Sequence, residues 1–584
     1  MRQYYLTRLI GIAFIALAYL GCTQGNKGLS ARFKDCNILL ISIDTLRADH
    51  LSCYGYERET SPHIDKVAAR GILFKNTIAP SSWTAPSMVS LFTSTYPINH
   101  GVVQGLVFRE KQKKSKQYSQ SVFSNELATL PEILKKQGYT TFGVSSNHNL
   151  QAKLGFARGF DYFKYRGYHL GSATAKHINE LVYLWEDKIK KSGKYFLWVH
   201  YMDPHFPYDA RSPWIERYIP QSSTNDELQA QSNLVAPYDS EINYVDSYVG
   251  ELIQKFELDK KTLLIITSDH GEQFLEHGRI GHSLSLHQEE IHVPLIIQLP
   301  GASEMVRIEN QASLLDIVPT ILHILDTDLP EQTIGKVLLK DKSPLNWLKT
   351  LFSRRGEARY IFSELDKKPT LKAIITPAWK YIYNYKNKTD QLYRIQSDPN
   401  EHNNLAVKNP TQCNQLKKEL LNWVSTAKTY PVKNQSFELS QEEKEKLEAI
   451  GYLDAQTPEQ KQSQEGLMTK KGRKDEREVK ESARVENKNA FLKIVDLSDK
   501  LLGIELTNTV PVRGIQFTLE GVKISEVRTT AHTKGFLAEF NSESGAVIII
   551  SFSGDKIKVG KNQIVEVVYE MAEMANLSKI KIVE

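Results

Sequence analysis

The stretch Asn37–Asp44, NILLISID, is an almost unbroken run of apolar residues that ends in a carboxylate. Thr262–Glu272, TLLIITSDHGE, repeats this pattern, and its first carboxylate is Asp269. Such runs lack the polar alternation of a half-exposed strand, so they predict strands buried on both faces. Amphipathic segments such as Tyr238–Glu257 separate the runs and predict covering helices. The sequence therefore predicts an α/β fold, with a mostly parallel sheet that has helices on both faces.

The ends of these strands hold the first candidate site. Ligands of open α/β sheets bind outside the carboxyl ends of the strands, so Asp44 and Asp269 are expected to converge. His270 follows Asp269 directly. Two carboxylates and an imidazole are suitable ligands for one divalent cation.

A third segment, Ser81–Ser94 with the sequence SSWTAPSMVSLFTS, places Thr84 where a loop meets a short helix. The simplest interpretation is a helix N-cap, because Pro86 suits a first helical turn and a Thr hydroxyl can accept a backbone N–H bond there. A second interpretation follows from the convergent carboxylates. A metal lowers the pKa of a bound hydroxyl, so Thr84 would be a metal-bound nucleophile. A helix N-terminus also favours the anionic oxygens of a sulfate or phosphate ester.

Composition limits the class of protein. The chain has 584 residues, of which 41% are hydrophobic and 24% charged, so it can bury a large core and form more than one domain. The formal net charge is only +6, and no DNA-binding motif or sustained basic stripe accompanies it. Nucleic acid is therefore not an expected partner.

The N-terminus predicts export. Two arginines precede the apolar run Leu9–Leu20, which is short for a bilayer span and fits a signal peptide over residues 1–21. Cleavage before Cys22 would give a lipoprotein that contacts the membrane through its lipid, whereas cleavage after Ala18 is the alternative. The expected location is periplasmic, outer-membrane-anchored or secreted. The four cysteines are too few for a disulfide scaffold.

The C-terminal part of the chain changes in character after Leu453. Residues 454–489 are charged and poor in aromatic residues, which predicts a solvated linker. Residues 490–584 contain short apolar strands between Gly, Asn and Ser turns, which predicts a separate β-sandwich. One phrase of this region, IELTNTVPVRGIQFTLEGVKI, weakly resembles cohesin-like modules.

Several motifs between Cys36 and Leu453 occur together: NILLISIDTLRADHLSCYGY, TSPHIDKVAARGILFKN, TAPSMVSLFTSTYPINHG, TSDHGEQFLEHG, LYRIQSDPNEHNNL and LEAIGYL. With them the chain resembles the sulfatase family of the alkaline phosphatase superfamily. The resemblance implies a catalytic domain over residues 36–453, with an alkaline phosphatase-like sheet and a smaller C-terminal subdomain. It also implies one divalent metal ion (Ca, Mn, Mg or Zn) held by Asp44, Thr84, Asp269 and His270, with Thr84 at the nucleophile position.

The chain departs from the family where sulfatases carry a Cys/Ser-x-Pro-x-Arg sequence, whose first residue is oxidised to formylglycine. Thr84 replaces the Cys, and Met88 replaces the Arg. Oxidation of a Thr would give a ketone in place of that aldehyde, so formylglycine is not expected. Without an aldehyde hydrate, water or an alcohol must attack the covalent intermediate, as in Thr- or Ser-using phosphatases and phosphotransferases. Thr45, where many sulfatases have a second metal-binding Asp, also favours phosphoryl chemistry.

The resemblance adds two histidines to the site. His205 lies in a Pro-His-x-Pro context, where the family's His faces the ester and protonates the leaving oxygen, so we expect it to be the general acid. His282 lies where relatives place a Lys or His on the anionic group, so it would stabilise transition-state charge.

These observations predict an exported, metal-dependent hydrolase of sulfate or phosphate esters, with a preference for phosphoryl groups. Its expected substrate is an anionic ester on a saccharide, lipid head group or envelope polymer. One alternative is an envelope phosphotransferase of the same superfamily. A second alternative is a non-catalytic, sulfatase-like envelope binding protein, in which Thr84 is a cap and the metal is a structural clip.

Overall fold

The computed structural model describes residues 33–103, 107–108, 118–167, 174–209, 211–218, 226–256, 261–339, 359–366, 370–437, 490–498, 501–508, 514–529, 537–540, 546–550 and 560–583. The predicted signal peptide over residues 1–21, the lipid-acceptor Cys22 and the predicted linker over residues 454–489 lie outside the described residues.

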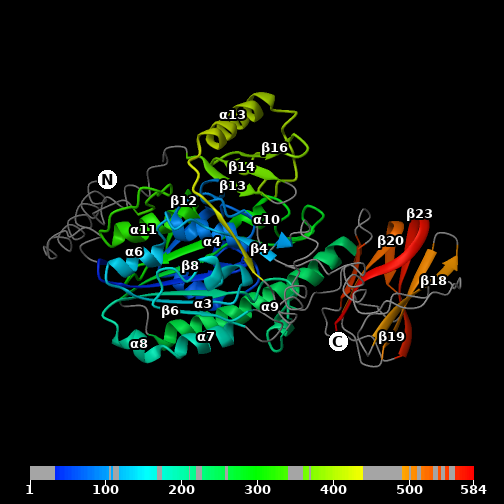
Figure 1. Cartoon of the computed structure of the whole chain (residues 1–584), viewed down its shortest axis with the longest axis horizontal. Coiled ribbons are helices and arrows are strands. Elements are labelled where there is room, and N and C mark those ends of the chain that lie inside the picture. The colour runs from blue at the N-terminus through cyan, green and yellow to red at the C-terminus, as the bar shows by residue number, and fades with distance from the viewer. Residues whose placement is uncertain are drawn as a thin grey trace, which may run out of the picture.

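An eight-stranded sheet forms the centre of the molecule, in the order β12-β2-β11-β8-β1-β7-β5-β6 (Figure 1). Its strands are β1 (Asn37–Ile43), β2 (Ile72–Ile78), β5 (Thr140–Ser145), β6 (Tyr162–Tyr165), β7 (Tyr195–Tyr201), β8 (Thr262–Ser268), β11 (His292–Gln298) and β12 (Val306–Ser313). Both neighbours of β11 are antiparallel to it, and the other paired strands of the sheet run parallel. The predicted mostly parallel sheet is confirmed.

Strand β1 shows why this sheet needs covering on both faces. Ile38 and Leu40 belong to one hydrophobic core, and Leu39, Ile41 and Ile43 belong to a second core on the opposite face. The first core includes side chains of α4 (Thr84–Thr93), α6 (Leu130–Lys136) and α11 (Ile317–Ile324). The second includes side chains of α3 (Pro62–Ala68), α7 (Ala175–Tyr183), α8 (Glu186–Lys191) and α9 (Asp226–Lys255). Helices therefore cover both faces, as the apolar runs predict.

A smaller unit follows the central sheet in the chain and lies at the top of Figure 1. It is the antiparallel sheet β13 (Ile361–Leu365), β14 (Leu371–Ile375), β15 (Lys380–Asn384) and β16 (Thr389–Tyr393), with α13 (Pro410–Thr426). Cys413, Leu416 and Leu420 of α13 pack in one core with Ile374 and Tyr381 of the sheet. This unit confirms the predicted C-terminal subdomain.

Shorter elements complete this part of the chain. β17 (Lys433–Phe437), β4 (Tyr118–Val122) and β3 (Val107–Phe108) form a small sheet, and β9 (Gln273–Phe274) pairs with β10 (Ile280–Gly281). Over the described residues, the remaining helices are α5 (Pro97–His100), α10 (Gln288–Ile291) and six 3-10 turns, which are Ala48–His50, Ser52–Tyr54, His148–Leu150, Ala152–Leu154, Ile215–Arg217 and Leu314–Asp316.

The C-terminal region is entirely β in its described residues. It contains β18 (Ala490–Ser498), β19 (Leu501–Asn508), β20 (Gly514–Thr529), β21 (Leu537–Phe540), β22 (Ala546–Ile550) and β23 (Gly560–Val583). They form one antiparallel sheet in the order β18-β19-β23-β20-β22-β21. The predicted strands are present and hydrogen-bond in one order, and the long pair β20 and β23 contains register shifts of the kind that bend strands.

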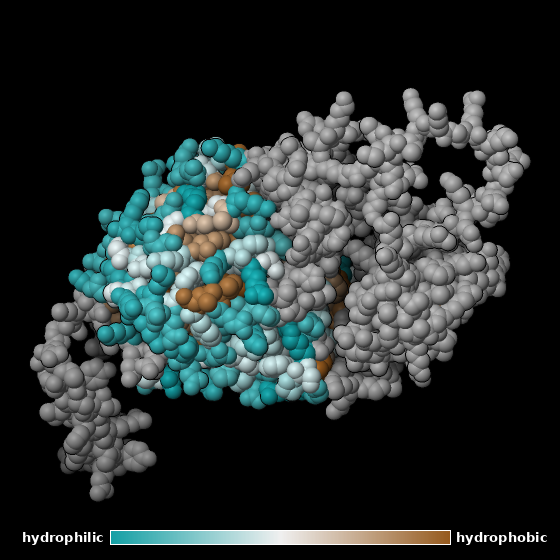
Figure 2. Space-filling model, turned by 60° about the horizontal axis from the view of Figure 1, so that its bottom comes forward, coloured by the Kyte–Doolittle hydropathy of each residue, from teal (hydrophilic) through white to brown (hydrophobic). Residues whose placement is uncertain are grey.

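The surface in Figure 2 is mainly hydrophilic over its described residues, with hydrophobic residues in small separate patches. Within the described parts of the chain, no helix has the length and apolar character needed to cross a bilayer. Cys36, Cys53 and Cys413 are buried free thiols.

Candidate active site

The predicted convergence of strand ends is present. β1 and β8 are parallel neighbours, and Ile43 lies beside Ser268 in their register. The residues that follow, Asp44 and Asp269, therefore leave the sheet side by side. Ligand atoms of Asp44, Asp269 and His200 all lie within 4.8 Å of one another, and all three residues are buried.

The two oxygens of the Asp44 carboxylate have different surroundings. Oδ2 accepts a hydrogen bond from Asn147 Nδ2 at 2.5 Å and lies 3.1 Å from His200 Nε2. Oδ1 is buried without a hydrogen-bond partner. Asp269 is similar, since its Oδ1 accepts the His270 backbone N–H at 3.0 Å and its Oδ2 is buried without a partner. Each carboxylate therefore leaves one buried oxygen for a ligand that the chain itself does not supply.

His270 directs one ring nitrogen at these two oxygens. Its Nε2 is 3.6 Å from Asp44 Oδ1 and 3.4 Å from Asp269 Oδ2. Its Nδ1 is 3.0 Å from the carbonyl of Gly271 and can donate to it, which leaves the lone pair on Nε2. An imidazole held in this tautomer is a suitable metal ligand.

Thr84 joins the same group. It is the first residue of α4, the cap position belongs to Trp83, and no side-chain cap bond is made there. The Thr84 hydroxyl lies 3.3 Å from His270 Nε2 and accepts a hydrogen bond from Asn147 Nδ2 at 3.2 Å. The interpretation of Thr84 as a simple N-cap is therefore wrong, because its hydroxyl is oriented toward the site.

The charges of the site favour a cation. Burial would raise the pKa of Asp44, but the hydrogen bond from His200 and the nearby His205 and His270 outweigh it and lower that pKa. Burial and the Asp44 charge raise the pKa of Asp269 well above its usual range. Burial lowers the pKa of His270 well below its usual range. Each carboxylate therefore opposes ionisation of the other, and a cation beside both would allow both to ionise.

The residues present fit a divalent metal. Asp44 Oδ1, Asp269 Oδ2, His270 Nε2 and Thr84 Oγ1 are the four predicted ligands, and they face one another in a buried site. Two carboxylates, an imidazole and a hydroxyl form a mixed oxygen and nitrogen donor set for one divalent cation.

The two predicted catalytic histidines lie beside this group. The His282 ring centroid is 4.5 Å from that of His270 and 4.8 Å from that of His205. His282 Nδ1 is 3.0 Å from Glu272 Oε1, and burial raises the pKa of Glu272 to about 8. Burial, followed by the neighbouring His282, lowers the pKa of His205. The structure thus brings together every residue predicted for the site.

Sequence reasoning missed three residues that orient these groups, namely Asn147, His200 and Glu272. Asn147 follows the end of β5, so the strand-end rule that identifies Asp44 could have found it. His200 is on β7, where Ser42 Oγ lies 2.8 Å from its Nδ1 while its Nε2 faces Asp44. Only the pairing of β7 with β1 reveals that role.

Thr45 and Met88 occupy the two positions where the sequence departs from the sulfatase pattern. Thr45 has a φ of 55°, in the left-handed region that β-branched residues rarely adopt, and its hydroxyl is buried without a partner. Met88 is fully buried in the hydrophobic core that includes α4. The side chain in place of the sulfatase Arg therefore packs among apolar residues.

Comparison with known proteins gives two family matches. The model for "Sulfatase" matches residues 36–327 of the 584, which is half of the chain. The model for "N-sulphoglucosamine sulphohydrolase, C-terminal" matches residues 276–429.

Two curated relatives illustrate the extent of the similarity. An N-acetylgalactosamine-6-O-sulfatase of Bacteroides thetaiotaomicron is 24% identical over 72% of this chain and 98% of its own length. An arylsulfatase K of Canis lupus familiaris is 33% identical, over 30% of this chain and 34% of its own length. The chain thus matches only about a third of arylsulfatase K.

Solved structures share the fold. The phosphonate monoester hydrolase of Agrobacterium radiobacter has a TM-score of 0.54 at 18% identity and covers 70% of this chain and 99% of its own. A protein solved in complex with its substrate D-glucosamine-2-N,6-O-disulfate has a TM-score of 0.52 at 18% identity and covers 67% of this chain and 98% of its own.

Proposed function

Because the chain belongs to the sulfatase family, whose members hydrolyse sulfate esters, we propose that it is a metal-dependent hydrolase in which Thr84 is the nucleophile. The observation that carries this proposal is the position of the Thr84 hydroxyl, 3.3 Å from His270 Nε2 and 3.2 Å from Asn147 Nδ2, at the first residue of α4. A structural cap would be bonded to the helix backbone instead.

The proposed reaction has two displacements. Thr84 Oγ1 gives its proton to solvent and attacks the sulfur or phosphorus of the ester, the bond to the leaving oxygen breaks, and His205 gives that oxygen a proton. Water then attacks the covalent intermediate and gives one proton to His205, the bond to Thr84 Oγ1 breaks, and the inorganic anion is released. A proton from solvent restores the Thr84 hydroxyl. A divalent cation held by Asp44, Thr84, Asp269 and His270 would supply a Lewis acid that lowers the pKa of the hydroxyl.

The residues around the nucleophile have assignable roles in this reaction. Asn147 donates to both Asp44 and Thr84, so it fixes the position of the carboxylate relative to the hydroxyl. His282, oriented by Glu272, would donate to the equatorial oxygens as negative charge develops. The N-terminus of α4 favours the same charge.

We favour phosphoryl over sulfuryl esters as the preferred substrate. Neither residue required for formylglycine is present, and the Met88 side chain that replaces the Arg is packed among apolar residues of the core. The covalent intermediate must therefore be cleaved by water at sulfur or phosphorus, as Thr- and Ser-using phosphoesterases do. A phosphonate monoester hydrolase with the same fold agrees with this preference.

The relatives guide our proposal for the molecule that carries the ester group. N-acetylgalactosamine-6-O-sulfatase and the structure bound to D-glucosamine-2-N,6-O-disulfate both concern sulfated amino sugars. A saccharide is therefore the preferred carrier, ahead of a lipid head group or other envelope polymer. The apolar run near the N-terminus supports export, with Cys22 as the candidate lipid acceptor.

The proposal is tested by comparing the purified full chain on an aryl sulfate, an aryl phosphate and a phosphodiester, with Mn²⁺, Zn²⁺, Ca²⁺ or Mg²⁺ added. Thr84→Ala is the control and should lose about 10³-fold or more in kcat. Faster phosphoester cleavage that disappears in the variant supports the proposal. Faster cleavage of the sulfate ester would contradict the phosphoryl preference, and full activity of Thr84→Ala would contradict the nucleophile.

The two alternatives predict different outcomes of the same assay. A phosphotransferase would release the leaving group faster when an alcohol acceptor is added, and it would transfer the phosphoryl group to that alcohol. A non-catalytic binding protein would bind metal and cleave none of the three ester classes.

A further inference from the structure

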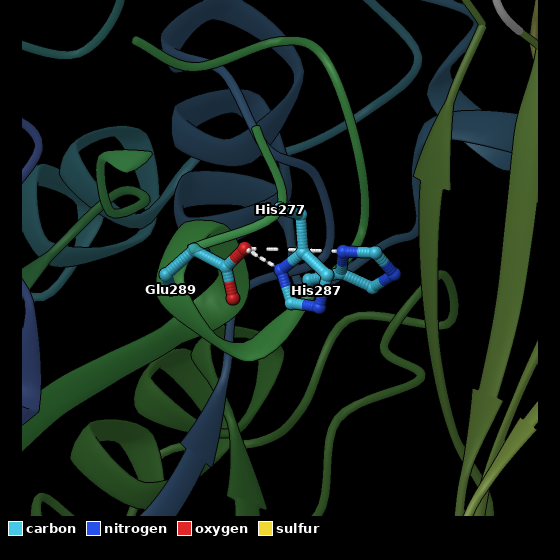
Figure 3. A group of neighbouring side chains, drawn as sticks. All are labelled: His277, His287 and Glu289. Carbon is cyan, nitrogen blue, oxygen red and sulfur yellow. Dashed lines mark hydrogen bonds and ion pairs between the residues drawn. The ribbon is translucent and has the colours of Figure 1, made fainter. Parts of the chain in front are cut away.

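A second group of potential metal ligands lies outside the residues of the proposed reaction. It consists of His277, on the loop between β9 and β10, His287, directly before α10, and Glu289, on α10. One ligand atom from each of these residues lies within 4.8 Å of the other two. Figure 3 shows one oxygen of Glu289 directed at both imidazoles.

The distances suit a shared cation. Glu289 Oε1 is 2.6 Å from His277 Nδ1 and 3.8 Å from His287 Nδ1. Two ligands of a tetrahedral zinc at about 2.0–2.1 Å from the metal are about 3.3 Å apart. The observed separations lie on either side of that value, so small side-chain rotations would bring the three donors onto one ion.

His287 is the feature that an ion pair alone does not explain. The residue is 7% exposed, and neither Nδ1 nor Nε2 has a hydrogen-bond partner. A buried imidazole without a partner loses the hydrogen bonds that it makes in water. Its ring is packed against that of His277, with centroids 3.8 Å apart and an interplanar angle of 38°. A metal ion would satisfy one of the two nitrogens of His287 and the lone pair of His277 together.

The tautomer of His277 agrees with this assignment. Its Nε2 is 3.2 Å from the carbonyl of Glu401 and can donate to it, so Nδ1 is the nitrogen that faces the Glu289 carboxylate. Nδ1 is 2.6 Å from Glu289 Oε1, a distance at which a proton lies between the two atoms in the metal-free protein, and a bound metal ion would take the place of that proton. A backbone carbonyl that accepts from the second nitrogen is the usual outer partner of a metal-bound His.

We propose that His277, His287 and Glu289 form a second metal site, selective for Zn²⁺ or a similar borderline transition metal. Two imidazoles and one carboxylate favour zinc over the hard ions Ca²⁺ and Mg²⁺. A third imidazole, that of His402, has its ring centroid 5.8 Å from that of His277. The site does not depend on which ester the chain hydrolyses.

The position of this site gives it a structural role. Glu401 of the C-terminal subdomain contacts His277 through its carbonyl and accepts the Gln288 backbone N–H through its carboxylate at 3.0 Å. On the other side, Glu289 accepts the Glu272 backbone N–H at 2.9 Å. A metal held here would therefore tie the subdomain to the turn that carries Asp269 and His270.

Gly271 shows how closely α10 packs against that turn. A Cβ built on Gly271 would lie 2.1 Å from the carbonyl oxygen of Glu289, so only glycine allows this approach. A shift of the Glu289 backbone would therefore displace Gly271, which directly follows the proposed metal ligands Asp269 and His270.

The test is a zinc count on the full chain. Protein stripped with a chelator is dialysed against a zinc buffer, and bound zinc is measured by mass spectrometry of the metal. Wild type should bind two ions per chain, His287→Phe one, Asp269→Asn one, and the double variant none. His63→Phe, at a half-buried histidine of α3, is the matched control and should bind as wild type does.

Two further measurements separate a lost site from a lost fold. Glu289→Gln is nearly isosteric and should also lose one zinc, while circular dichroism confirms that each variant is folded. In the Asp269→Asn background, Co²⁺ should give visible d–d absorption that His287→Phe removes. The proposal is overturned if His287→Phe and Glu289→Gln bind as much zinc as wild type, or if wild type binds only one ion and Asp269→Asn binds none.

Discussion

At the scale of single residues, the site depends on two buried carboxylates. They lie so close together that ionising both without a cation is unfavourable. Asp44 keeps its charge because His200 and Asn147 both contact its Oδ2. Asp269 has no such support for its Oδ2, and its pKa is raised by burial and by Asp44. The pair therefore destabilises the metal-free fold and is relieved when a cation binds.

This balance predicts the behaviour of Asp269→Asn. A carboxyl whose pKa is raised in the folded state costs stability once the pH exceeds its unfolded pKa of about 3.9. Removing that carboxyl should raise the melting temperature of the metal-free protein at pH 7. The unfolding free energy of wild type should rise by about 2.7 kcal/mol at a metal concentration 100 times Kd, and that of the variant should rise much less. Calorimetry with and without metal measures both effects.

Asp239→Asn is the matched control for this prediction. The Asp239 carboxylate is also buried, but it is contacted by His50, Tyr56 and Arg58. This substitution should lower the melting temperature in both conditions. A metal-free Asp269→Asn protein that melts below wild type would contradict the assigned repulsion.

The pH dependence of turnover tests His205 as the general acid. Burial lowers its pKa, so the free enzyme loses the required proton as the pH rises through a value below 6.5. The plot of kcat/KM against pH reports the free enzyme, so its high-pH limb should fall as the pH rises through that low pKa. Bound ester anion stabilises the imidazolium, so the high-pH limb of the kcat plot should fall at a higher pH. His205→Gln should remove both limbs for a poor leaving group. Identical limbs for kcat and kcat/KM would contradict this assignment.

At the scale of elements, the strand ends and the helix α4 position the chemistry, and the sequence predicts them to different degrees. The apolar runs identified β1 and β8, and the parallel-sheet rule brought Asp44 and Asp269 together. The direction of β11 and the contribution of His200 on β7 depend on strand order, which no local pattern contains. His205 and His282 rested on resemblance, because loop conformation carries no periodic signal.

The role of α4 predicts the effect of Met88→Arg. Met88 is fully buried among apolar side chains, so an Arg there would place a charge without a partner in the core. The variant should lose about 3 kcal/mol or more of unfolding free energy, whereas Met88→Leu should lose less than about 1.5 kcal/mol. Urea unfolding measures both. A stable Met88→Arg protein would show that this position can accept the sulfatase Arg.

At the scale of the whole molecule, the described residues divide into a catalytic part and a C-terminal sheet. The hydrophobic cores that surround the site and the subdomain contain residues from Phe33 to Leu420. The six-stranded sheet begins at Ala490, beyond the predicted linker. Composition indicates that the chain changes in character after Leu453, whereas the strand order of this sheet and the register shifts between β20 and β23 are not contained in composition.

This organisation predicts that a chain ending at Leu453 stays folded and active. Its kcat/KM on a small aryl ester should equal that of the full chain, because every residue of the site precedes that point. Melting temperature and turnover of the two proteins, measured side by side, check this expectation. Loss of turnover by a folded, shortened chain would assign the C-terminal sheet a part in catalysis.

The central claim is that Thr84 is the nucleophile, and the covalent intermediate tests it most directly. Enzyme turning over an activated aryl phosphate is quenched in acid, digested and analysed by mass spectrometry, with Thr84→Ala treated in the same way. The account predicts a phosphoryl group on Thr84 in wild type and no modified residue in the variant. A phosphoryl group on another residue, or an unmodified Thr84 during a burst of product, would contradict it.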